Sequence, residues 1–188
     1  MNKTTSIMKN LQKYALIFVA AAMLVACGPS REERVEQIED FEDSLFELAI
    51  AADPATADEL TALYESFASK YPDDPLTPQY LMKAADVQSN VLHTERAIQL
   101  YDRVINNYPD FQAIPDCYML KGHTYELNSQ YEEAREAYQI FVDKFPDHYM
   151  ADQIRITIPR VGMSNEEMLA DILAHANDTI IAQSAPVK

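Results

Sequence analysis

The sequence predicts an all-α protein built as a tandem array of helical hairpins. Three segments share one form, an aromatic residue followed by Pro and Asp, and they recur every 37 residues: Tyr71-Pro72-Asp73, Tyr108-Pro109-Asp110 and Phe145-Pro146-Asp147. The 188-residue chain holds only 3 Gly, whereas the helix-favouring residues Ala, Leu, Glu, Gln and Met are frequent. Because Pro ends a helix and a fixed period marks an internal repeat, we expect one helical unit to recur along the chain.

The first 26 residues have the pattern of a secretory leader. A basic segment containing Lys3, Lys9 and Lys13 precedes an uninterrupted apolar run, residues 14–26. As a helix this run would be about 20 Å long, which is too short to span the ~30 Å core of a membrane comfortably. A basic segment followed by a short apolar one is typical of a signal peptide.

The leader ends at Leu24-Val25-Ala26-Cys27, which resembles the lipobox of bacterial lipoproteins. The resemblance implies cleavage after the signal peptide, residues 1–26, and membrane anchoring through acyl chains on Cys27. An ordinary secretory signal with a coincidental Cys is the alternative. Gly28 stands where the inner-membrane retention signal has Asp, which favours the outer membrane. We expect the periplasmic face rather than the cell surface, but the sequence leaves the choice of face open. If Cys27 is acylated, Cys117 lacks a disulfide partner, and we interpret it as a buried apolar residue rather than a reactive thiol.

The remaining chain divides into four predicted parts. Residues 27–40 form the lipidated N-terminus and a lead-in helix, residues 41–148 form three hairpins, residues 149–176 form capping helices, and residues 177–188 form a flexible tail. Capping-box patterns, a Ser or Thr followed three residues later by Glu, predict helix starts at four places: Ser30/Glu33, Thr56/Glu59, Ser129/Glu132 and Ser164/Glu167.

The third hairpin has a bulky residue, a small residue, an aromatic, an Ala, a second aromatic and a Pro at set intervals: Tyr118, Gly122, Tyr125, Ala134, Tyr138 and Pro146. This pattern resembles the tetratricopeptide repeat. The second hairpin matches at Leu81, Ala85, Ala97, Tyr101 and Pro109 but has Gln88 where an aromatic is usual. The first keeps Tyr64 and Pro72 but departs at Ser44, Leu48 and Leu60.

The resemblance implies an α-α superhelix of about three tetratricopeptide repeats, closed by C-terminal capping helices. Small residues such as Gly122 and Ala85 would lie where two helices approach closely. Three residues after the second aromatic, the usual Ala is replaced by Phe67, Val104 and Phe141. Together with the 37-residue period, this resembles outer-membrane repeat lipoproteins of the BamD type and the type associated with Tol–Pal.

Composition and motifs argue against nucleic-acid binding and catalysis. The formal net charge is −15, so the surface repels phosphate backbones. The four histidines lack the spacing of a helical zinc site: His93, His123, His148 and His175. We also find no glycine-rich phosphate loop, nucleophile elbow or calcium loop. The sequence therefore predicts no enzyme activity, no cofactor and no metal.

The resemblance places a partner-binding groove along the first helix of each hairpin. The usual groove positions carry over to eight residues: Leu45, Ala49, Met82, Asp86, Asn90, Met119, His123 and Glu126. Methionine is adaptable and common on peptide-binding surfaces, but Met82 and Met119 could equally be core residues.

The predicted function is that of a non-catalytic, lipid-anchored scaffold that binds other envelope proteins at the outer membrane, in envelope or outer-membrane protein assembly. The alternative is an accessory binding subunit of a nutrient-uptake or wall-remodelling complex. The sequence makes no prediction of the oligomeric state.

Overall fold

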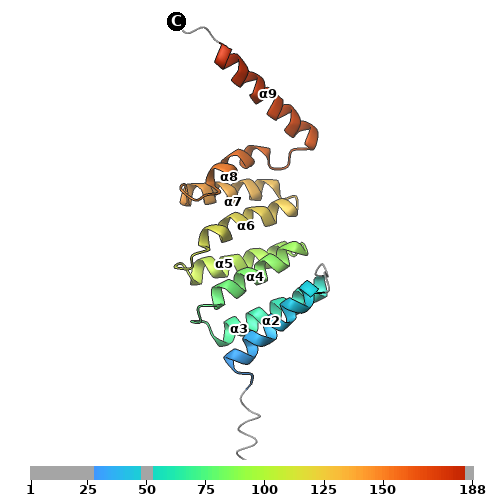
Figure 1. Ribbon diagram of the computed structural model, residues 1–188, viewed down its shortest axis with the longest axis vertical. Helices are drawn as coiled ribbons and strands as arrows, with labels where there is room; N and C mark the ends of the chain where they lie inside the picture. Colours follow the sequence, from blue (N-terminus) through green and yellow to red (C-terminus); the bar gives the residue numbers. More distant parts are fainter. Residues whose placement is uncertain (1–27, 48–52, 185–188) are drawn as a thin grey trace, which may run out of the picture. The chain divides into compact units, whose positions relative to one another are not determined.

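The computed structural model describes residues 28–47 and 53–184 (Figure 1), so the leader, Cys27 and Ala49 lie outside the described residues. Every regular element in these ranges is helical, which confirms the predicted all-α class. The elements are α2 (Arg31–Glu47), α3 (Pro54–Lys70), α4 (Thr77–Asn90), α5 (Thr94–Asn107), α6 (Ile114–Leu127), α7 (Tyr131–Lys144), α8 (Ala151–Thr157), the 3₁₀ turn η1 (Ile158–Arg160) and α9 (Asn165–Ser184). The chain divides into two compact units, with α2 in the first and α3 to α9 in the second.

The predicted capping box begins α2. The Ser30 backbone N–H donates to Glu33 Oε2 at 2.7 Å, and the Glu33 N–H donates to Ser30 Oγ at 3.2 Å. Ile38 is buried, whereas Leu45, predicted to line the groove, is half-buried near the end of this helix. The same reciprocal pattern begins α9, where the Ser164 N–H donates to Glu167 Oε2 at 2.8 Å and the Glu167 N–H to Ser164 Oγ at 3.2 Å. Two of the four predicted capping boxes are therefore confirmed.

The other two predicted capping boxes are wrong. The helix α3 begins at Pro54, and Asp53 Oδ1 accepts hydrogen bonds from the N–H groups of Ala55 at 2.9 Å and Thr56 at 3.1 Å. Aspartate followed by Pro at the first helical position is the stronger start signal, so Thr56 lies inside the helix. At the start of α7, Ser129 adopts a left-handed conformation with φ of 58° and makes no side-chain cap.

Successive helices of the second unit pack as antiparallel hairpins, α3 on α4, α4 on α5, α5 on α6 and α6 on α7 (Figure 1). Small residues lie at the close approaches, as predicted. A Cβ added at Gly122 would be 2.4 Å from Cδ1 of Tyr138, which is far inside van der Waals contact. Ala85, Ala97 and Ala134 are fully buried. The small residues of the repeat pattern therefore allow its helices to meet.

The turn between α4 and α5 and the turn between α6 and α7, which lie inside the second and third hairpins, have the same backbone geometry. Leu92 and Ser129, which are 37 residues apart, both adopt left-handed conformations, with φ of 61° and 58°. The N–H of the following residue reaches back to the carbonyl five residues earlier, from His93 to Gln88 at 3.0 Å and from Gln130 to Tyr125 at 2.9 Å. This is the Schellman arrangement, which satisfies the last carbonyls of a helix and needs one left-handed residue.

After the third hairpin, α8 and η1 pack against α7. Ile154 and Val161 are buried there, in one cluster with Phe141 and Val142. This part of the predicted capping segment covers the hairpin.

The helix α9 does not cover the third hairpin in this way, because four of its apolar side chains are exposed: Met168, Leu169, Ile172 and Leu173. An ion pair between Arg160 Nε and Asp171 Oδ2, 2.8 Å apart, joins it to η1. It extends to Ser184, where the sequence predicted a flexible tail from residue 177. Within residues 28–47 and 53–184, no helix combines the length and apolar content needed to cross a membrane.

Candidate protein-binding surfaces

The structure places six of the eight predicted groove residues on α4 and α6 of the second unit. Asn90 and His123 are exposed, while Met82 and Met119 are half-buried. Met119 packs against the cluster that contains Phe141 and Val142, so it contributes to the core at least in part. Leu45 lies on α2 in the first unit, and Ala49 lies outside the described residues. Among the seven predicted groove residues that the structure describes, only Asn90 and His123 are therefore exposed.

The two predicted groove carboxylates are bound to buried tyrosines of the second helix of their own hairpin. Tyr101 Oη donates a hydrogen bond to Asp86 Oδ1, and Tyr138 Oη donates to Glu126 Oε2 at 2.8 Å. Burial raises the pKa of Asp86, and the hydrogen bond from Tyr101 partly offsets this rise. Burial likewise raises the pKa of both tyrosines, which keeps their hydroxyl groups protonated as donors. Asp86 and Glu126 thus join two helices at predicted groove positions, so charge reversal there would test stability and binding together.

A buried polar network, which sequence reasoning missed, joins α3 to the second hairpin. Gln88 Nε2 donates to Thr61 Oγ1 at 2.9 Å and to Asp58 Oδ1 at 3.0 Å, and Gln88 Oε1 lies 2.7 Å from His93 Nδ1. Gln88 is almost completely buried, so these partners satisfy a side chain that would otherwise be costly to bury. The signal in the sequence was the Gln itself, at a position where the repeat pattern has an aromatic.

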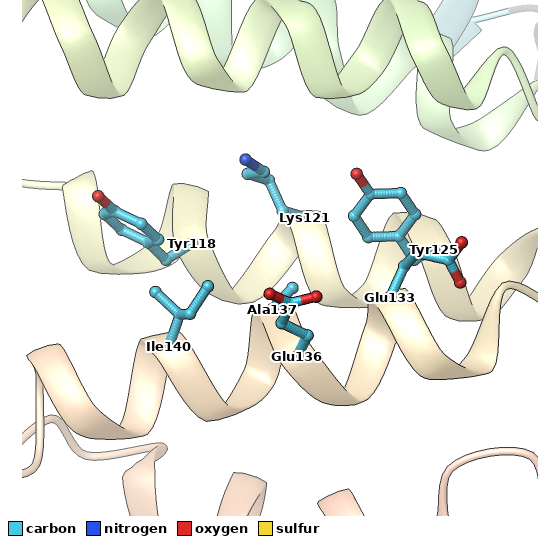
Figure 2. Close-up of a pocket in the computed structure, with 7 residues that line it drawn as sticks. All are labelled: Tyr118, Lys121, Tyr125, Glu133, Glu136, Ala137 and Ile140. Atoms are coloured by element: carbon cyan, nitrogen blue, oxygen red, sulfur yellow. The ribbon is translucent and has the colours of Figure 1, made fainter.

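A pocket between α6 and α7 is the second feature that the sequence did not predict (Figure 2). Its volume is about 230 Å³, and α6 and α7 supply the side chains around it: Tyr118, Lys121, Tyr125, Glu133, Glu136, Ala137 and Ile140. We call it the α6–α7 pocket. Lys121 Nζ forms an ion pair with Asp102 Oδ1 on α5. In the second repeat the equivalent residue, 37 positions earlier, is Ala84. A Lys in place of this small apolar residue was the sequence feature that could have pointed to the pocket.

In the described residues we find no candidate metal centre, and the thiol of Cys117 is buried. Within residues 28–47 and 53–184, no group of three or more His, Cys, Asp or Glu side chains could hold a metal ion. Cys117 is fully buried, and burial raises the pKa of its thiol to about 12. The thiol therefore stays protonated at neutral pH, which confirms its interpretation as a buried apolar residue.

Comparison with known proteins agrees with this geometry. Residues 79–110 and 116–148 each match the family model of the tetratricopeptide repeat, and they are the second and third of the three predicted repeats. No curated protein matches the sequence. Tetratricopeptide repeats mediate protein–protein interaction and are typically found in non-catalytic scaffolds. Residues 79–110 and 116–148 thus each match one tetratricopeptide repeat, and repeats of this kind indicate a protein–protein interaction scaffold.

Proposed function

We propose that this protein is a non-catalytic, lipid-anchored scaffold that holds another envelope protein at the periplasmic face of the bacterial outer membrane, in envelope or outer-membrane protein assembly. The observation that carries the proposal is the pair of adjacent tetratricopeptide repeats, whose first helices α4 and α6 leave Asn90 and His123 exposed on the groove positions. Repeats of this kind bind extended or helical segments of other proteins along such a surface.

The sequence around Cys27 supports the anchor. A lipobox-like segment precedes it, and α2 begins at Arg31, only four residues later. At no more than about 3.6 Å per residue, this connection is shorter than ~15 Å. Acylated Cys27 would thus hold α2 close to the membrane surface. Acyl chains anchor a protein without a spanning helix.

Membrane fractionation tests the anchor. The Cys27→Ala variant is expected to leave the membrane fraction, whereas Cys117→Ala, the matched control at the other cysteine, should remain there. Metabolic labelling with a fatty acid should mark the wild type and Cys117→Ala and leave Cys27→Ala unmarked. Retention of Cys27→Ala in the outer membrane would refute lipid anchoring at this residue.

Crosslinking and pull-down from native membranes test the groove. Asn90→Trp combined with His123→Trp would block the surface of α4 and α6 and should abolish capture of the partner. Gln99→Trp combined with Gln139→Trp is the matched control, because both residues are exposed on the second helices α5 and α7. Recovery of a barrel-assembly or Tol–Pal component with wild type and control supports the assignment. Equal recovery with the blocked variant would show that the groove is not the binding surface.

A further inference from the structure

The α6–α7 pocket lies on a different side of α6 from the predicted groove. Its α6 residues are Tyr118, Lys121 and Tyr125, whereas the groove residues of the same helix are Met119, His123 and Glu126. At about 100° per residue, the centres of these two stripes lie roughly 130° apart around the helix axis. Lys121 on the pocket side of α6 forms an ion pair with Asp102 of α5, so this side of α6 faces α5. The pocket is therefore a separate surface from the groove.

One end of the pocket is apolar and held in place. Tyr118 and Ile140 lie at this end (Figure 2), and Ile140 is 38% exposed although it is a large apolar residue. The Tyr118 ring lies 5.5 Å from the Phe145 ring, and Lys144 Nζ lies 5.4 Å from the centroid of the Tyr118 ring on its face. These contacts fix the aromatic wall before any partner binds, which lowers the entropic cost of binding.

The α7 side of the pocket is acidic beyond this apolar end. Glu136 lies midway along the pocket, and Glu133 lies at the far end near Tyr125 (Figure 2). Both carboxylates are exposed, and neither forms an ion pair with any side chain in the described part of the chain. The nearby cations have other partners, since Lys121 pairs with Asp102, and Arg135 pairs with Glu132 and donates to the Val161 carbonyl at 2.8 Å. The pocket thus presents two unneutralised carboxylates beside an apolar surface.

The size and spacing of the pocket define what fits it. A volume of about 230 Å³ is below the ~300–1,000 Å³ of typical small-molecule sites, so it suits one anchoring side chain of a protein partner. Glu136 and Glu133 precede Ile140 on α7 by four and seven residues, which corresponds to about 6 and 10 Å along the helix. A complementary segment carries an aromatic or branched apolar residue with a Lys or Arg about 6–10 Å away.

A second copy of this chain does not supply such a segment through α9. The exposed apolar residues of α9, such as Leu169 and Ile172, directly follow Glu166 and Glu167 in the first turns of the helix. These carboxylates would be brought next to Glu133 and Glu136, and like charges in close contact oppose association.

We propose that the α6–α7 pocket is a second docking site, which binds a segment of another protein by inserting an apolar side chain between Tyr118 and Ile140 and placing a Lys or Arg beside Glu133 and Glu136. This inference rests on the proposed scaffold role and assigns it a second surface. The two surfaces would let the repeats hold one partner at two points, or two partners at once.

Selection from a random 12-residue phage-displayed peptide library, with the full chain purified in mild detergent as bait, tests the docking site. Enriched peptides should contain an apolar residue and a Lys or Arg four or seven positions apart in a helix, or two or three apart in a strand. Their synthetic copies are then titrated by fluorescence anisotropy. Binding should weaken as KCl rises from 0.05 to 0.5 M, because salt screens exposed charges.

Four variants locate the peptides. Glu133→Gln combined with Glu136→Gln should weaken binding roughly three- to twentyfold, and Ile140→Ser about tenfold. The controls Glu132→Gln combined with Asp143→Asn, which removes two charges from the same helix, and Ile156→Ser, which removes an exposed Ile elsewhere, should leave binding unchanged. A selection that enriches acidic peptides or none, or equal loss in pocket and control variants, overturns the proposal.

The groove variant separates this inference from the proposed function. Peptides that bind the Asn90→Trp/His123→Trp protein normally but not the pocket variants support the second site. Peptides lost in the groove variant and unaffected by the pocket variants overturn the second site and leave the scaffold role intact.

Discussion

The second and third repeats place different side chains at equivalent positions of one backbone pattern. Gln88 of the second repeat is buried and hydrogen-bonded to Thr61 and Asp58 of α3. Tyr125, 37 residues later, is half-buried and lines the α6–α7 pocket. It also packs against the apolar cluster that contains Phe141 and Val142. The repeat period determines which positions contact a neighbouring helix. The residues of that neighbouring helix determine whether a polar or an apolar side chain is stable at such a position.

The tyrosines of the two repeats show the same distinction. Tyr101 and Tyr138 are equivalent, and each donates to a carboxylate on the first helix of its own hairpin. The acceptors are not equivalent, because Asp86 corresponds to His123 and Glu126 corresponds to Ser89. A buried hydroxyl needs an acceptor, but helix positions one turn apart can supply it.

The largest expected effect is at the close approach of α6 and α7. Gly122→Leu should lower the free energy of unfolding by more than about 4 kcal/mol, because even a Cβ at this position would be 2.4 Å from the Tyr138 ring. Gly122→Ala, which installs the residue of the second repeat, should cost less. Urea unfolding measures both, and Ala62→Leu at an exposed position of α3 is the control. An unaltered Gly122→Leu midpoint would contradict the packing described for the third repeat.

The next effect is at the polar network. Gln88→Tyr, which installs the residue of the third repeat, should cost about 2–4 kcal/mol, because it overfills a buried site and leaves Thr61 without its donor. Chemical denaturation provides the measurement. Gln88→Leu combined with Thr61→Val should recover part of the loss, since removing both partners avoids an unpaired buried group. If Gln88→Tyr is as stable as wild type, the network contributes nothing.

A smaller, pH-dependent effect is expected at Tyr101. Tyr101→Phe should cost about 1.5–3 kcal/mol at pH 7, because Asp86 loses its donor. Burial already raises the pKa of Asp86 above 3.8. Between the pKa of the unfolded state and the higher pKa of the folded state, the folded protein therefore holds a proton that the unfolded chain has released. The free energy of unfolding that this group contributes falls as the pH rises through this range. Without Tyr101 the pKa rises further, so the loss should be smaller at pH 4 than at pH 7. Asp86→Asn in the same background should remove this pH dependence.

The sequence alone predicts some of these features and misses others. The 37-residue period and the small residues were sufficient for the hairpins and for the packing role of Gly122. The start of α3 was not predictable from Thr56 alone, since Asp53-Pro54 offers a competing signal three residues earlier. The groove carboxylates were assigned from the face of one helix, but the tyrosines that bind them come from the next helix. The α6–α7 pocket depends on side-chain directions in two helices, which no single-helix pattern contains.

The smallest expected effect is at the Pro-containing turns. Tyr108 Oη donates to the Pro72 carbonyl at 3.0 Å in an exposed setting, whereas the third repeat has Phe145 at the equivalent position. Tyr108→Phe should therefore change the unfolding free energy by no more than about 0.5 kcal/mol, measured by the same urea titration. A loss above 1 kcal/mol would show that this bond couples adjacent repeats more strongly than its exposure indicates.

The left-handed residues of the two hairpin turns affect how far this protein could be stabilised. Leu92 adopts φ of 61° while its side chain is 56% exposed, so it has an unfavourable backbone conformation with little compensating burial. Glycine or asparagine would adopt the same conformation at lower cost. Position 92 lies on the turn and is neither a predicted groove residue nor a lining residue of the α6–α7 pocket. It is therefore a site where thermal tolerance could be engineered without replacing a residue of either surface.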